Sequence, residues 1–129
     1  MSRSETITHR VRVQVESSYS EEHSTPASKH WFFLYKVRIG NEGQKAVRLV
    51  QRHWIITDAS GNTEEVRGPG VVGQQPLLQP GESFEYTSGC PLRTPFGSMR
   101  GSYQMLGDGG QLFDAEIAAF ALSEPGSEH

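Results

Sequence analysis

The sequence predicts an all-β fold, a sandwich or barrel of seven or eight short antiparallel strands. Apolar and polar residues alternate with a period of two in several short segments, and turn residues separate those segments at regular intervals. The chain has 129 residues, which suits one domain with its own hydrophobic core. We expect this domain to span residues 9–122, between a flexible N-terminus at 1–8 and a flexible polar tail at 123–129.

The first half of the chain contains four of the expected strands. RVRVQVES places Val11, Val13 and Val15 on one face and polar side chains on the other. HWFFLYKVRIG also alternates, and it ends in an Asn-Glu-Gly turn. KAVRLVQRHWIITD is longer and rich in β-forming residues, and TEEVRG follows it after a turn at 58–62.

The second half contains three more strands. LLQPGESFEYTSGC has a Pro-Gly turn followed by a strand, and TPFGSMRGSYQML aligns Met99, Tyr103 and Met105 on one face. The glycine-rich segment at 107–110 predicts a hairpin turn before the last strand, QLFDAEIAAFAL. DAEIAAFAL could also form a helix, but its short length and the preceding hairpin signal favour a strand.

Two aromatic residues have positions that the alternation alone does not decide. Trp54 is expected in the core between the two sheets, as a large aromatic residue commonly is in a sandwich. Phe32 lies on the opposite face of its strand from Phe33. It is therefore either half-covered by neighbouring structure or part of a recognition patch, and we favour the covered position.

The composition narrows the class of protein. Acidic residues outnumber basic ones by 15 to 12, a net charge of −3, which argues against a dedicated DNA or RNA binder. The single cysteine, Cys90, allows no intramolecular disulfide, and the N-terminal segment lacks the apolar region of a secretion signal. No apolar run approaches membrane-spanning length. We therefore expect a cytoplasmic protein whose partners include neither a membrane nor a nucleic acid.

The residues that could act in catalysis or bind a metal ion do not have the spacing of a known catalytic or metal-binding site. The five histidines lack the spacing of zinc ligands, so we expect no metal and no cofactor. Cys90 has no obvious base beside it and is interpreted as a small buried or semi-buried residue, not a nucleophile. Glu64 and Glu65 are neighbours on a strand and must point to opposite faces, so they cannot converge on one substrate atom. We assign no catalytic residue.

One segment matches the sequence pattern of a nucleotide-binding motif. Residues 68–73, GPGVVG, read G-x-G-x-x-G, which in dinucleotide-binding proteins opens a helix whose N-terminus holds the pyrophosphate. Here Pro76 and Pro80 prevent a regular helix, and Pro69 removes one backbone donor. The segment therefore predicts a loop between strands, in which the glycines supply positive φ angles or allow close backbone approach.

The same segment, with the residue before it, is nevertheless the candidate binding site. A compact glycine loop can direct several N–H groups at one anion without a helix, and an adjacent arginine adds positive charge. Weak binding of phosphate or pyrophosphate is therefore a possible activity of this loop. The residues of this candidate site are Arg67, Gly68, Gly70, Val71 and Gly73.

Much of the chain resembles the ApaG family of bacterial proteins, also called CorD. The matching motifs occur in order and at the family's spacing, and the resemblance covers about residues 9–122. The matching motifs are HWIIT at 53–57, Val66 with GPGVVG, QP at 75–76, PGE at 80–82, YTSG at 86–89 and TPFGSM at 94–99.

This resemblance implies a fibronectin type III-like or immunoglobulin-like β-sandwich, in agreement with the strand pattern. It implies no established enzymatic activity, and it links the chain by name and gene neighbourhood to cobalt and magnesium resistance and to diadenosine tetraphosphate metabolism. Related domains in an F-box protein and in a DNA-polymerase-associated protein resemble protein-binding modules.

We therefore expect a non-enzymatic module that contacts a protein partner through the glycine loop and an adjoining sheet face or edge. The alternative is a protein that binds phosphate, a nucleotide or a divalent metal ion such as magnesium or cobalt. The resemblance alone does not decide between the two, because one fold can carry many functions.

Overall fold

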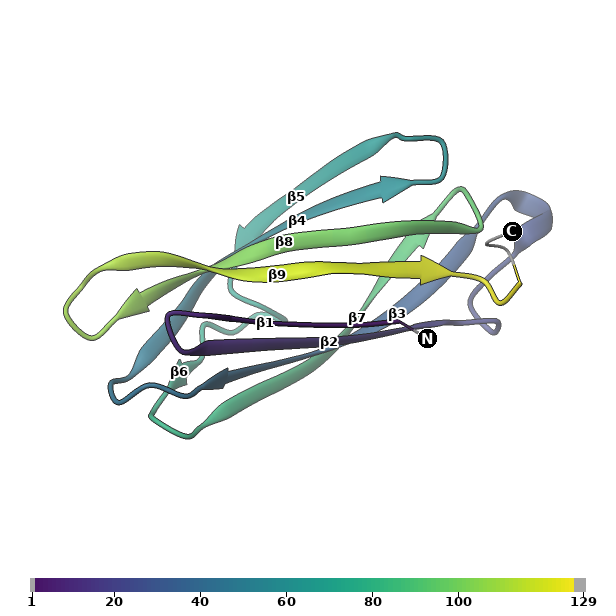
Figure 1. Ribbon diagram of the computed structural model, residues 1–129. Helices are drawn as coiled ribbons and strands as arrows, with labels where there is room; N and C mark the ends of the chain where they lie inside the picture. The colour runs from purple at the N-terminus through teal and green to yellow at the C-terminus, as the bar shows by residue number, and fades with distance from the viewer. Residues whose placement is uncertain (1, 127–129) are drawn as a thin grey trace.

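Two antiparallel sheets pack face to face as a sandwich in the computed structural model, which describes residues 2–126 (Figure 1). One sheet contains, in spatial order, β1 (Ser2–Thr8), β2 (Val11–Tyr19), β3 (Trp31–Asn41) and β7 (Ser83–Leu92). The other contains β5 (Thr63–Pro69), β4 (Val47–Asp58), β8 (Phe96–Gly107) and β9 (Leu112–Ser123), and the short β6 (Leu77–Leu78) pairs with β4. A single 3₁₀ turn spans Pro26–Ser28, and the described residues contain no α-helix.

The core lies where the alternating apolar residues of the two sheets meet. Val11, Val13 and Val15 of β2 are buried, as the alternation predicts. Trp54 of β4 is only 3% exposed, and its ring contacts that of Tyr35 from the opposite sheet at a centroid distance of 5.2 Å. The predicted sandwich and the core position of Trp54 are thus confirmed, and the last segment is a strand and not a helix.

The N-terminal segment differs from the expectation of a flexible end at residues 1–8. Ser2–Thr8 forms β1, which pairs with β2 along its whole length, from Ser2 opposite Ser17 to Thr8 opposite Val11. Its inward-facing residues are serines and threonines, so it lacks the apolar alternation by which the other strands are recognised. At the other end, Ser123 belongs to β9, and most of the expected tail, residues 127–129, lies outside the described residues.

One side of the sandwich is closed by hydrogen bonds between β1 and β9, which run side by side (Figure 1). Main-chain groups of β9 bond with side chains of β1: the Thr6 hydroxyl donates to the Glu116 carbonyl at 3.4 Å, and the Glu116 N–H donates to the Thr8 hydroxyl at 3.2 Å. The Ala121 N–H donates to the Ser2 hydroxyl at 3.0 Å. On the opposite side, within residues 2–126, the outer edges of β5 and β7 pair with no further strand.

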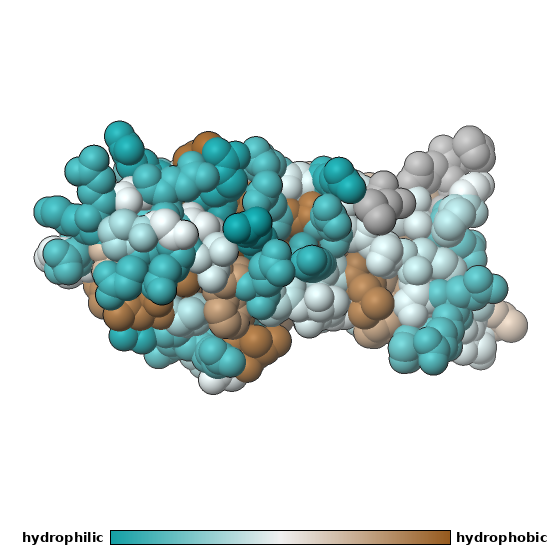
Figure 2. Space-filling view, turned by 90° about the horizontal axis from the view of Figure 1, so that it is seen from below, coloured by the Kyte–Doolittle hydropathy of each residue, from teal (hydrophilic) through white to brown (hydrophobic). Residues whose placement is uncertain are grey.

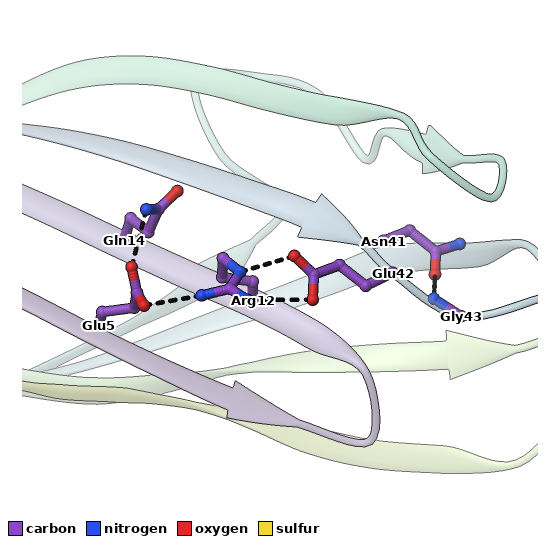
Figure 3. Close-up of polar contacts among 6 residues, drawn as sticks. All are labelled: Glu5, Arg12, Gln14, Asn41, Glu42 and Gly43. Atoms are coloured by element: carbon purple, nitrogen blue, oxygen red, sulfur yellow. Dashed lines mark hydrogen bonds and ion pairs between the residues drawn. The ribbon is translucent and has the colours of Figure 1, made fainter.

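The outer face of the four-stranded sheet is held by an ion-pair network (Figure 3). Arg12 of β2 donates through Nε and Nη2 to the two oxygens of Glu42, at 2.6 and 3.2 Å, and through Nη1 to Glu5 of β1 at 2.7 Å. Its hydrogen bond with Glu42 lowers the pKa of that carboxyl and raises the pKa of Arg12. Seen from below the view of Figure 1, the surface is largely hydrophilic, with separate apolar patches (Figure 2).

Phe32 takes the covered position on the outer face of this sheet. It is half-buried, and its ring lies over Gly89 of β7, where an added Cβ would come within 2.2 Å of the phenyl Cζ. The rings of His23 and His30 flank it at centroid distances of 5.7 and 6.3 Å. Gly89 is therefore needed to seat Phe32, and this aromatic ring packs against its own chain.

Candidate functional site

The predicted site residues fall on β5 and on the turn that follows it. Arg67 and Gly68 lie in β5, opposite His53 and Arg52 of β4. The chain then leaves the sheet after Pro69 and forms a compact loop over residues 70–76 before β6 begins. Of the glycine motif at 68–73, Gly68 and Pro69 thus belong to β5, and from here on the glycine loop means residues 70–76.

The tip of the glycine loop is a two-residue turn with an unusual backbone. Val71 and Gln74 exchange both main-chain hydrogen bonds, at 2.8 and 2.9 Å. The two residues between them, Val72 and Gly73, have φ angles of +43° and +78°, which is the pattern of a type I′ turn. Val71 is 1% exposed and anchors the turn in the core, whereas Val72 is 55% exposed at its tip.

The base of the loop is fastened to β4. A bulge interrupts the β4–β8 register between Leu49 and Gln51, and the carbonyl of Val50, at this bulge, points to the loop. It accepts hydrogen bonds from the Gly70 N–H at 2.8 Å and from Nε2 of Gln75 at 2.9 Å. The irregularity in β4 thus supplies the acceptor that holds the loop in place.

Arg52 of β4 forms a second attachment. Its Nη1 donates to the carbonyls of Pro69 and Gly70, both at 3.0 Å. The guanidinium lies over Gly68, where an added Cβ would be 2.8 Å from Nη2. No sequence signal identified Arg52, because its role depends on the register between β4 and β5.

The three glycines of the motif have the roles expected of them. Gly70 and Gly73 have φ angles of +58° and +78°, and Gly68 allows the close approach of Arg52. At Gly70 an added Cβ would lie 2.0 Å from the carbonyl oxygen of Gln74, so any side chain there would force the loop to move.

Three of the main-chain donors that a phosphate cradle could use are already engaged. The N–H groups of Gly70, Val71 and Gln74 all donate to carbonyls of the protein. No helix follows the loop, because Leu77–Leu78 forms β6. Arg67 is exposed and lies 3.5 Å from the carboxylate of Glu65 in its own strand, which offsets its charge.

A cleft of about 260 Å³ opens between the sheets beside β5. It lies on the open side of the sandwich, and the residues that line it come from β3, β4, β5, β7 and β8. Arg52 and Glu64 contribute polar groups, and Trp54 and Val66 contribute apolar surface. These residues are scattered along the sequence, so sequence analysis did not bring them together.

Cys90 lines the same cleft and is buried, as expected from the sequence. Burial raises the pKa of its thiol to about 12, so the thiol stays protonated near neutral pH. Glu64 and Glu65 point apart as expected, since Glu64 lines the cleft while Glu65 accepts a hydrogen bond from His53 at 2.8 Å. The hydrogen bond from His53 lowers the pKa of Glu65.

Two further findings concern metals and membranes. Across residues 2–126, no three side chains of the histidine, cysteine, aspartate or glutamate type gather where they could share a metal ion. The same residues include no helix of the length and apolar character that a membrane crossing requires.

Comparisons with known proteins agree with this structure. The model of the ApaG domain family matches residues 21–107. A Protein ApaG from Anaeromyxobacter dehalogenans is 55% identical over 94% of this chain and 95% of its own, and one from Pseudomonas paraeruginosa is 53% identical over 94% and 96%. The crystal structure of a putative ApaA protein from Bordetella pertussis superposes with a TM-score of 0.88 at 52% identity, covering 90% of this chain and 94% of that one. The chain belongs to the ApaG domain family.

Proposed function

We propose that this protein is a non-enzymatic, cytoplasmic binding module that contacts a protein partner through the glycine loop and the adjoining sheet. The observation that carries the proposal is Val72. This apolar, β-branched residue is 55% exposed at the tip of the loop, at a φ angle of +43°.

Both properties of Val72 are unfavourable for the isolated protein. A left-handed backbone disfavours β-branched side chains, and an exposed valine gains little from the hydrophobic effect. Strained residues persist when the surrounding structure fixes them, and they cluster at sites of recognition. A partner that covers Val72 would recover the hydrophobic contribution that the isolated protein lacks.

The rigid base of the loop supports this role. The attachments to Val50 and Arg52 hold the tip in one position before any partner arrives. A preorganised loop loses less conformational entropy on binding, so a small contact can still be specific. Binding of phosphate, nucleotide or a divalent cation at the loop is the competing function, and Arg67 is the residue that favours it.

Replacing Val72 by Asn tests the proposal, because Asn accepts a positive φ but removes the apolar contact. The tagged wild-type and Val72→Asn proteins would be used to capture partners from a lysate of the cells that make the protein. We expect the variant to retain about a tenth of the captured partner, the effect of a moderate contact residue. Leu112→Asn is the matched control, because Leu112 is 58% exposed on β9 and away from the loop.

Calorimetric titration decides the competing function. Pyrophosphate, diadenosine tetraphosphate, Mg²⁺ and Co²⁺ would each be added to the wild-type protein and to Arg67→Ala. We expect no binding at micromolar concentrations. Micromolar binding of an anion that is lost in Arg67→Ala, together with unchanged capture by Val72→Asn, would replace the proposed function by its alternative.

A further inference from the structure

On the open side of the sandwich, no strand within residues 2–126 pairs with the outer edge of β5, and the charges along this edge are self-complementary. We propose that β5 pairs with β5 of a second copy of this chain, antiparallel and centred on Val66, so that two sheets join into one continuous sheet. This inference does not rest on the proposed function, although β5 adjoins the glycine loop, because its tests measure self-association and not capture of a different protein.

The direction of the main-chain groups in β5 permits this pairing. The Gly70 N–H points to β4, where it donates to the Val50 carbonyl. Main-chain groups alternate in direction with a period of two, so those of Pro69, Arg67, Glu65 and Thr63 point away from β4. Pro69 has no N–H, but in the centred register it lies at the end of the pairing, opposite Thr63 of the second copy. Its carbonyl, which already accepts from Arg52 Nη1, has a second lone pair for the Thr63 N–H, and the Thr63 carbonyl is left to solvent.

Opposite charges meet on one face of the joined strands. A register centred on Val66 places Glu65 directly opposite Arg67 of the second copy, and the two-fold axis repeats the pair. Directly opposite side chains in an antiparallel pair lie on the same face and within contact distance. In the single copy Glu65 accepts a hydrogen bond from His53 and lies 3.5 Å from Arg67, but the two side chains remain 54% and 72% accessible, so each can also contact its partner in the second copy.

The other face is complementary as well. Val66 meets Val66 of the second copy on the axis, which extends the apolar lining of the cleft. Glu64 lies opposite Gly68 of the second copy, and the guanidinium of Arg52 covers that glycine. Because Gly68 has no side chain, the guanidinium of Arg52 lies where Glu64 of the second copy would be placed, so these two opposite charges would meet.

The remaining edges of the sandwich do not offer such a surface. β1 and β9 bond to each other through side chains. β7 contains a single charged residue, Glu85, which lies 3.8 Å from Lys36 of the same copy. Pairing of β7 with itself would therefore bring no opposite charges together.

Charge reversal tests the register. Seven-residue edges form a small interface, so we expect the wild-type protein to dimerise at concentrations on the order of 0.1–1 mM. Arg67→Glu places two carboxylates opposite each other and should abolish the dimer in sedimentation equilibrium. The double variant Glu65→Arg, Arg67→Glu restores opposite charges in this register, so the dimer should return. A double variant that stays monomeric while the wild type dimerises would overturn the register.

A cysteine on the two-fold axis provides a second test. Val66 faces Val66 as a non-hydrogen-bonded pair, with Cα atoms about 4.5 Å apart, a distance that a disulfide spans. Cys90 lines the same cleft as Val66, so the test uses a Cys90→Ala background, in which Val66→Cys should form covalent dimers on mild oxidation. Thr63→Cys in that background is the control, because its two copies would be about 20 Å apart. A wild-type protein that remains monomeric at about 1 mM, with no cross-link at Val66→Cys beyond that at Thr63→Cys, would refute the proposal.

Discussion

The strained tip of the glycine loop predicts that Val72→Asn stabilises the folded protein. At a φ angle of +43° a β-branched residue stores about 2 kcal/mol of backbone strain. Asn tolerates this region much better, because its short polar side chain bonds locally. Val72 is 55% exposed, so making it polar gives up less than about 1 kcal/mol of hydrophobic burial. The net gain in the free energy of unfolding is therefore about 1 kcal/mol.

Urea unfolding followed by tryptophan fluorescence measures this gain. We expect a higher midpoint at an unchanged slope, which indicates altered stability without altered compactness, and a melting temperature higher by about 3–5 °C. Leu112→Asn removes a similarly exposed side chain whose φ is not positive, and it should bring no gain. If Val72→Asn proves no more stable than the wild type, the turn is not strained and the argument from Val72 to partner binding loses its basis.

Three further predictions concern the sheets, the surface charges and metals. Gly101→Ala should destabilise the protein by about 3 kcal/mol in the same urea assay, because its Cβ would lie 2.0 Å from the main-chain oxygen of His53; a loss below about 1 kcal/mol would contradict this. The lowered pKa of Glu42 means that its pairing with Arg12 stabilises the protein fully above its unfolded pKa near 4.5 and is lost as pH falls through the lower folded value. The melting temperatures of wild type and Arg12→Met should therefore converge as pH is lowered from 7 to 3, and a constant difference would argue against the pair. We expect no bound metal, so adding a chelator should leave the melting temperature unchanged. A metal bound only to the folded state would raise the melting temperature, so a clear drop on adding the chelator would reveal such a metal.

Most of the fold could be predicted because the inward residues of most strands are apolar and alternate with their neighbours. β1 could not, since its inward residues include Ser2, Thr6 and Thr8, which bond to the main chain of β9 instead of packing in the core. β6 is only two residues long and gives no periodic signal. The sequence pattern thus misses one strand that is stabilised by polar contacts with a distant segment and one that is too short to show a period.

The candidate site could be predicted only in part, because residue type indicates the conformation of its glycines but not that of Val72. Residue type alone indicated positive φ angles or close approach at Gly68, Gly70 and Gly73. It did not indicate Val72, because the same rule assigns a left-handed conformation to glycine or asparagine and counts against a β-branched residue. Here the burial of Val71 and the register with β4 determine the turn, and both are properties of the tertiary structure.

The seam between β1 and β9 also bears on the order in which the chain folds. The hydrogen bond from Ala121 to Ser2 joins residues 119 positions apart, so its formation closes nearly the whole chain into one loop. On the ribosome the first strand is synthesised early but lacks its β9 acceptors and donors until the last strand emerges. β1 can pair with β2 during that interval, yet its other edge, the one that later contacts β9, stays exposed. The sandwich is therefore completed only after β9 has emerged, and a chain truncated before β9 would keep the edge of β1 open.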